Sequence, residues 1–228
     1  MPIANALLPA RPDLIAGMLA EYDGFGALVA PLSAEEWAAT TRCGGAPVRD
    51  VVGHVVGIVE DVAAGTPGSR TFEEEAAALG DDGPAEAVAR LNTALEGLRA
   101  LAAALDDDDV WNGPSGAPDL SMGDGVLTLW YDTYVHADDI RVALGRPSEP
   151  GAGERAALAY VVGHLDQEGF GPVRLAFTGS DHPSVATGAA DDTTATVSVD
   201  PHAFLLAATG RLDATTLGLD SAVNLYRD

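Results

Sequence analysis

The 228-residue sequence contains no lysine, and all twelve of its basic residues are arginine. Enzymes that form a Schiff base, that hold nucleotide phosphates with a P-loop lysine, or that use a serine–lysine nucleophile all need a lysine side chain. The absence of lysine therefore excludes these three classes of enzyme.

Cysteine is almost as scarce, because Cys43 is the only one. A single cysteine can form neither an internal disulfide nor a cluster of thiolate metal ligands. We therefore interpret Cys43 as a small buried hydrophobic residue. If this protein performs thiol chemistry, we expect a ligand to supply the thiol.

Excess positive charge and long apolar runs are also missing. A formal net charge of −23 argues against nucleic-acid binding, which depends on neutralising phosphates, and against an anionic membrane surface. No apolar run approaches the roughly 20 residues of a membrane-spanning helix. Residues 1–5 contain no basic region that leads into an apolar one, so no secretion signal is expected. We expect a soluble, cytoplasmic protein, either monomeric or homodimeric.

Apolar periodicity predicts four long helices in the first 146 residues. Three are expected over residues 12–29, 47–64 and 84–105, and the fourth runs from the capping sequence at Ser121 to Gly145. Shorter helices are expected after Ser33 and over residues 72–79, and the acidic run 106–109 is interpreted as a solvated helix end. Four such helices fit an antiparallel bundle.

The pattern changes after residue 150. A helix is predicted over residues 152–170, strands over 173–178 and 194–199, and a further helix over 201–209. A turn region rich in glycine and aspartate separates the two strands. We therefore predict an α+β fold with a helical bundle over residues 1–150 and a small α+β domain over residues 151–228.

The candidate metal site is centred on the fourth long helix. Asp132 and His136 are four residues apart and share one face of that helix, an arrangement that also forms ordinary local hydrogen bonds. His54, on the second long helix, lies among valines and faces the core. In an antiparallel bundle these two helices can bring the three side chains together.

Two histidines and an aspartate form a ligand set found in catalytic zinc sites and also in facial-triad iron sites, so the identity of the metal stays open. Asp50 could orient His54, and Asp138 or Asp139 could orient His136. An alternative is that both histidines are core residues of a purely structural protein without metal. His164, His182 and His202 are interpreted as surface or domain-interface residues.

The glycines around His54 are a further feature of this helix. Gly53 and Gly57 remove side-chain bulk on either side of the histidine. We expect another helix to approach closely there.

Two segments carry a resemblance to a known family. They are Thr41-Arg42-Cys43 through Val48-Arg49-Asp50-Val51-Val52-Gly53-His54, and Asp132 through Arg141. They resemble the DinB-like superfamily and, within it, the mycothiol-dependent maleylpyruvate isomerase family, whose pattern is Arg-Asp-Val-Val-x-His followed much later by Glu-x-x-x-His. Asp132 stands where the family usually has glutamate, and the connection before Pro47 lacks an aromatic residue that is common there.

The resemblance implies a DinB-like four-helix bundle followed by a small, sterol-carrier-like α+β domain. It implies a divalent metal that is held by His54, Asp132 and His136, with Zn²⁺ as the leading candidate. It also implies mycothiol or a similar thiol as cosubstrate. The activated thiol would then be transferred to a small electrophile or would catalyse its cis–trans isomerisation. Arg211 matches the position of an arginine that holds the anionic substrate in the family. The alternative is a non-catalytic, metal-binding DinB-like stress or binding protein.

Overall fold

The computed structural model describes residues 6–191 and 193–227. The expectation drawn from residues 1–5, that no secretion signal is present, lies outside the described residues. The described chain forms two compact units, one of residues 11–149 and one of residues 6–10 with 150–227. The sequence predicted two domains with their boundary between residues 150 and 151. The correspondence between these domains and the two units stays a proposal.

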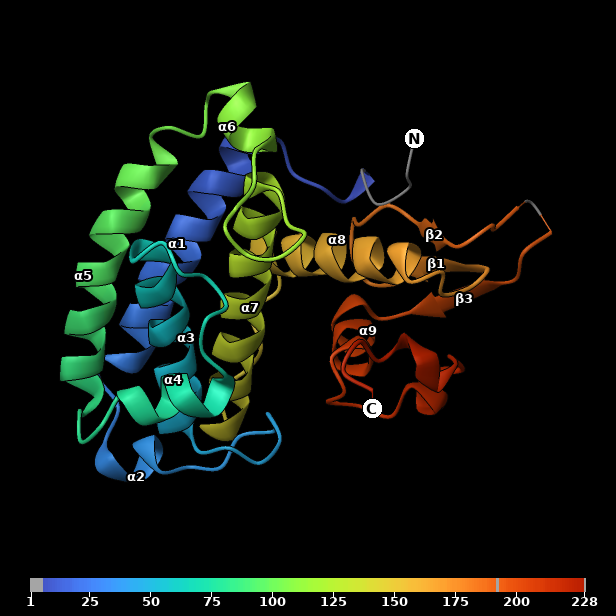
Figure 1. Cartoon of the computed structure of the whole chain (residues 1–228). Coiled ribbons are helices and arrows are strands. Elements are labelled where there is room, and N and C mark those ends of the chain that lie inside the picture. Colours follow the sequence, from blue (N-terminus) through green and yellow to red (C-terminus); the bar gives the residue numbers. More distant parts are fainter. Residues whose placement is uncertain (1–5, 192, 228) are drawn as a thin grey trace. The chain divides into compact units, whose positions relative to one another are not determined.

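The first unit is helical (Figure 1). Its elements are α1 (Arg11–Val29), α2 (Ala34–Trp37), α3 (Val48–Ala63), α4 (Phe72–Ala78), α5 (Pro84–Ala102), α6 (Asp108–Asn112) and α7 (Met122–Ala143). Helix α1 packs against α5 and α7, and α3 packs against the same two helices. The four long helices therefore close into a bundle, with the short helix α4 packed against α3.

The core of this unit explains why the four long helices stay together. Met18, Tyr22 and Phe25 of α1 are fully buried, and α3 buries a row of valines. Helix α7 is buried along almost all of its second half. A Cβ atom on Gly17 would stand 1.9 Å from the Trp130 ring, so the missing side chain at that position allows α1 to pack directly on α7.

The helix ends mostly follow local sequence rules. The capping sequence predicted at Ser121 forms a capping box closed by Asp124, and the helix expected after Ser33 begins with a capping box closed by Glu36. Residues 106–109 are exposed to solvent as expected, but they begin a helix and do not end one, because the Asp107 side chain accepts hydrogen bonds from two backbone N–H groups and caps the start of α6.

The second unit combines helices with a three-stranded sheet. Its elements are α8 (Ala152–Gln167), β1 (Val173–Phe177), β2 (Val185–Thr187), β3 (Thr196–Val199), α9 (Pro201–Ala208) and the short 3₁₀ helices η2 (Ala214–Leu217) and η3 (Ser221–Val223). The strand order is β2-β1-β3, with β2 antiparallel and β3 parallel to β1. Helix α8 packs against α9 and β2.

Strand β2 was not predicted from the sequence. It lies inside the region interpreted as a turn, and its three residues are too few for a visible alternation of apolar and polar side chains. It forms because Val185 pairs with Leu175 of β1, a contact that local pattern does not reveal. The α+β class itself is confirmed, since one small sheet accompanies a mainly helical chain.

The helices of the described residues also bear on membrane insertion. None of them combines the length and the apolar character that crossing a bilayer requires.

Candidate metal centre

Helix α7 supplies two of the three predicted ligands. Asp132 and His136 lie one helical turn apart, and Asp132 Oδ1 is 3.5 Å from His136 Nε2. The His136 side chain is 9% exposed and that of Asp132 is 18% exposed, so water reaches the pair only partly. The i, i+4 spacing therefore places both side chains together as expected.

Helix α3 brings the third side chain to the same point. His54 Nε2 is 3.5 Å from Asp132 Oδ1, the same oxygen that faces His136. The two imidazole rings have centroids 5.0 Å apart and are nearly perpendicular. One ligand atom from each of the three residues lies within 4.8 Å of the others. The structure thus brings together His54, Asp132 and His136.

The other ring nitrogen of each histidine faces a second carboxylate. His54 Nδ1 lies 2.6 Å from Glu75 Oε2, and His136 Nδ1 lies 3.3 Å from Asp139 Oδ2. These contacts leave both Nε2 atoms directed at Asp132, and carboxylates in this position fix the ring orientation of histidines that bind metals. The sequence suggested Asp50 as the partner of His54, but the partner in the structure is Glu75. For His136, the partner Asp139 is one of the two acids that were expected.

The position of Glu75 depends on the two glycines of α3. A Cβ atom on Gly53 would lie 2.8 Å from Ala76 Cα, and one on Gly57 would lie 2.6 Å from Glu75 Cβ. The helix expected to approach here is therefore α4, which starts at a capping box formed by Thr71 and Glu74. Glycine on α3 allows α4 to come close enough for Glu75 to reach His54.

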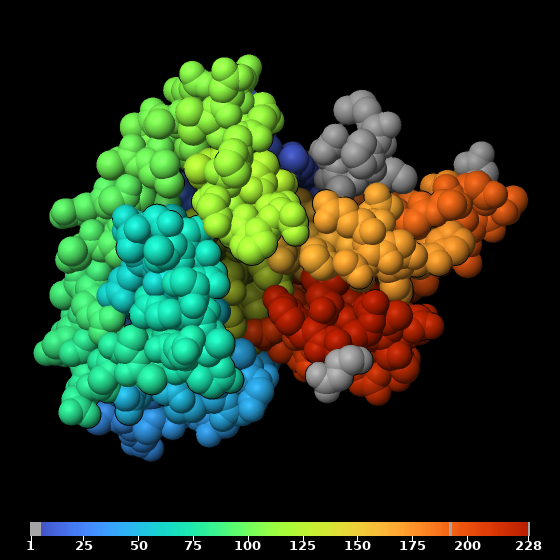
Figure 2. Space-filling model, viewed as in Figure 1, coloured from blue at the N-terminus to red at the C-terminus, as the bar shows by residue number. Residues whose placement is uncertain are grey.

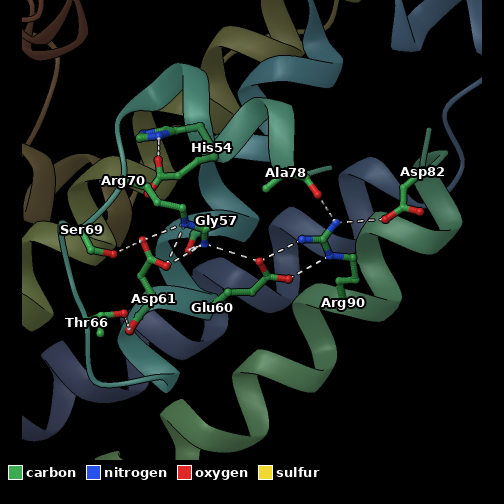
Figure 3. A network of polar contacts seen from close by, with 11 residues as sticks. His54, Gly57, Glu60, Asp61, Thr66, Ser69, Arg70, Ala78, Asp82 and Arg90 are labelled. Carbon is green, nitrogen blue, oxygen red and sulfur yellow. Dashed lines mark hydrogen bonds and ion pairs between the residues drawn. The ribbon is translucent and has the colours of Figure 1, made fainter. Parts of the chain in front are cut away.

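A polar network fixes the connection that leads into α4 (Figure 3). Arg70 donates to the buried Asp61 carboxylate through Nε at 2.9 Å and to the Gly57 carbonyl oxygen through Nη2 at 2.8 Å. Glu60, next to Asp61, binds Arg90 of α5 at 2.8 Å. These contacts tie the segment before α4 to α3 and α5.

Arg42 stabilises the other side of the centre. It comes from the loop between α2 and α3, and its Nε donates to Asp139 Oδ1 at 2.8 Å, while Nη2 bonds Asp138. The two aspartate side chains are 0% and 3% exposed. Arg42 therefore offsets part of the charge of a buried acidic pair and holds the carboxylate that contacts His136.

Cys43 lies beside this pair, and its interpretation as a buried hydrophobic residue was wrong. It is half-buried, and its sulfur is within 4.8 Å of ligand atoms of His136 and Asp139. A loop residue acquires such neighbours through tertiary packing, which composition alone does not report.

The charges of the cluster shift its pKa values strongly. Burial lowers the pKa of His54, but the Asp132 and Glu75 carboxylates outweigh burial and raise that pKa to about 9. Burial likewise lowers the pKa of His136, while Asp132 and Asp139 raise it well above its usual value. Burial raises the pKa of Asp132, but the two histidines hold it well below its usual range. Without metal, two imidazolium groups therefore surround one carboxylate.

The donor set fits a divalent metal. Asp132 Oδ2 is buried and has no hydrogen-bond partner among the described residues, although a buried carboxylate oxygen normally has one. Metal–nitrogen and metal–oxygen bonds of about 2.0–2.1 Å at tetrahedral angles place ligand atoms about 3.3 Å apart. The two 3.5 Å separations at Asp132 Oδ1 are close to that value. These three residues would hold the ion, with Glu75 and Asp139 behind the histidines.

The remaining sequence candidates lie in the second unit. Arg211 follows α9, and its guanidinium donates to the Thr209 carbonyl oxygen at 3.0 Å. His182 is 14% exposed and contacts the buried Glu154 carboxylate at 3.0 Å. The role of Arg211 in substrate binding stays a prediction.

A cavity of about 520 Å³ lies inside the helical unit, and His54 and Glu75 form part of its wall. Most of the other lining side chains are apolar and come from α1, α3, α5 and α7. The histidine side of the candidate centre therefore faces a space of the size that small-molecule ligands occupy.

The fold and the site together define a class of protein, a four-helix bundle with a His-Asp-His cluster followed by a small α+β unit. The chain belongs to the mycothiol maleylpyruvate isomerase N-terminal domain family, whose model matches residues 18–141. This confirms the family named from the sequence.

Solved structures agree in fold. The chain is similar to a mycothiol-dependent maleylpyruvate isomerase, with a TM-score of 0.61, 14% identity and coverage of 93% of this chain and 92% of the other. It is also similar to a mutant of such an enzyme in which alanine replaces a histidine, with a TM-score of 0.59, 13% identity and the same coverage. By sequence, no curated protein matches this chain.

The contact between His54 and Glu75 leads to a prediction about metal affinity. Glu75→Gln keeps the size of the side chain but removes the charge that orients and polarises His54, so we expect zinc affinity to fall about 10- to 100-fold. Zinc competition against a chromogenic chelator measures the change. Glu73→Gln, on the exposed face of the same helix, is the matched control and should leave the affinity unchanged. Equal affinities for both variants would show that Glu75 does not support the centre.

Proposed function

We propose that the chain is a divalent-metal-dependent enzyme that activates a low-molecular-weight thiol of the mycothiol type. The observation that carries the proposal is the cluster of His54, Asp132 and His136, in which both Nε2 atoms face one carboxylate oxygen. Family membership supports mycothiol as the thiol, and the resemblance names Zn²⁺ as the first metal to test.

A divalent ion bound by these three residues would supply a Lewis acid that lowers the pKa of a thiol and favours its thiolate near neutral pH. The residues of the chain perform the remaining tasks. Glu75 and Asp139 keep the histidine Nε2 atoms directed at the site, and the apolar walls of the cavity exclude water from the reacting groups.

The proposed reaction begins with a bond between the thiolate sulfur and an electrophilic carbon. In S-transfer, a leaving group departs from that carbon with the bonding electron pair, and the thiol proton passes to solvent. In cis–trans isomerisation, the sulfur adds to a conjugated double bond, the resulting single bond rotates, and the sulfur leaves again with its electron pair. Where a substrate carries an anionic group, Arg211 is proposed to hold that group, following the family resemblance.

The first test is metal content. The protein is purified without a chelator, and its metal is determined by elemental analysis beside His54→Ala, Asp132→Ala and His136→Ala. We expect about one divalent ion per chain in the parent and loss of the ion in each folded variant. His164→Ala, on α8 of the other unit, is the matched control and should retain the metal. A parent that binds no metal, even after reconstitution, would overturn the proposal.

The second test separates catalysis from binding. The metal-loaded protein is assayed with mycothiol and a panel of reactive electrophiles, and we expect turnover that requires both metal and thiol. Metal binding without turnover across the panel would instead support the non-catalytic alternative. A cytoplasmic location and a monomeric or homodimeric state stay predictions.

A further inference from the structure

The cavity beside His54 has walls that are almost entirely apolar. Its volume of about 520 Å³ is within the range of roughly 300–1,000 Å³ that is typical of small-molecule sites. Its apolar side chains come from all four long helices and include Met18, Ile58, Leu98, Leu101 and Val126. Such a surface favours a ligand with a comparable area of apolar surface to remove from water.

Two connections cover this cavity on one face of the helical unit. Residues of the segments 65–70 and 115–120 line it, and the segments lie side by side in the space-filling view (Figure 2). Pro67 touches the second segment, since its Cγ atom lies 3.1 Å from the position that a Cβ atom on Gly116 would take. The cavity is therefore shielded by loops as well as by helices.

The charged side chains that line the cavity among the described residues are His54, Arg70 and Glu75. Arg70 is already committed, because Asp61 and the Gly57 carbonyl oxygen accept its hydrogen bonds and Glu60 lies 3.6 Å away (Figure 3). Glu75 is committed to His54. The cavity thus offers no uncommitted positive side chain away from the histidine end.

This arrangement discriminates against charged ligands. A carboxylate placed among the leucines of α5 would lose its hydration without gaining a counter-ion, which weakens its binding. An uncharged apolar group does not meet this penalty.

We infer that this cavity binds an uncharged, largely apolar small molecule whose reactive carbon lies at the His54 end. Binding of the apolar body follows from the cavity itself. The description of the ligand as the electrophile of a thiol transfer rests on the proposed function. The substrate class is therefore neutral apolar electrophiles, and small dicarboxylates are disfavoured.

Direct binding tests the inference. N-phenyl-1-naphthylamine, an uncharged apolar dye that fluoresces in apolar surroundings, is titrated into the 228-residue protein. We expect saturable binding at one site per chain. Naphthalene-1,5-disulfonate, a dianion with a similar aromatic body, is expected not to displace the dye at a hundredfold excess. Efficient displacement by the dianion, or the absence of saturable binding, would overturn the inference.

Variants locate the dye. Ala102 lines the cavity and Ala103 is an exposed neighbour at the end of the same helix, so Ala102→Trp should weaken dye binding at least about tenfold and Ala103→Trp should not. Leu101→Arg adds a cation to the wall, and it should weaken dye binding and allow the dianion to bind, whereas Leu101→Met should do neither. Equal binding by Ala102→Trp and Ala103→Trp would place the dye elsewhere and contradict the inference.

The outcome is independent of the metal test. If Asp132→Ala loses the metal but binds the dye as the parent does, the result supports the cavity inference. This holds even if the enzymatic proposal is overturned. Metal-dependent thiol turnover confined to anionic electrophiles would leave the enzymatic proposal intact and overturn the inferred substrate class.

Discussion

Replacing Arg42 by alanine is expected to destabilise the helical unit by about 3 kcal/mol, because Asp138 and Asp139 then lose the guanidinium that they share. Both carboxylates are almost fully buried, and Arg42 bonds the two at once. For a chain of this length the loss corresponds to a fall in melting temperature of roughly 6–12 °C. Urea unfolding followed by circular dichroism measures it.

Two variants make the Arg42 experiment specific. Arg146→Ala removes an arginine whose pair with Glu36 is exposed, and it should cost less than about 1 kcal/mol. Arg42→Lys should fall between Arg42→Ala and the parent, because an ammonium group cannot match the fork of a guanidinium across two carboxylates. If Arg42→Ala costs no more than Arg146→Ala, the buried pair does not depend on Arg42.

Zinc binding at pH 7 is expected to release about two protons, because both histidines are protonated in the metal-free cluster and must be neutral to bind the ion. Below the pKa of His54, which is about 9, apparent zinc affinity should rise about a hundredfold per pH unit while two protons are displaced. Calorimetric titration in two buffers with different ionisation enthalpies counts the protons. Proton release near zero at pH 7 would show that the histidines are already neutral.

The same pKa shifts determine the stability of the metal-free fold. The raised pKa of His54 contributes stability below pH 6.5, and this contribution is lost as the pH rises through about 9. The lowered pKa of Asp132 contributes stability above about pH 4, and this is lost in acid. Zinc should therefore raise the melting temperature more at pH 8 than at pH 6, because it replaces the protons that the cluster loses.

The sequence predicted the long helices and the central ligands because both depend on short-range periodicity. Two residues that are four positions apart on a helix lie about one turn apart, so Asp132 and His136 could be paired without a structure. The expected antiparallel bundle then suggested His54 as the third ligand. In the structure, its helix α3 does pack on α7. The structure places the three side chains together, and their role as metal ligands stays a proposal.

The supporting residues could not be predicted in the same way. Glu75 is one of three consecutive glutamates, and only the docking of α4 on Gly53 and Gly57 decides which of them reaches His54. Arg42 and Cys43 come from a loop, where no period relates a residue to its neighbours in space. A sequence signal did exist for α4, because the glycine pair on α3 indicated a close approach without identifying the approaching helix.

The parts of the centre lie far apart along the chain, and this has a consequence for how it is made. Asp132 and His136 become neighbours as soon as α7 forms, whereas the contact between Arg42 and Asp139 spans 97 residues and that between His54 and Glu75 spans 21. Long-range contacts form after the chain has closed the intervening loops. A newly synthesised chain is thus expected to complete its topology before all parts of the centre meet, so that the proposed metal would bind a finished fold and would not nucleate it.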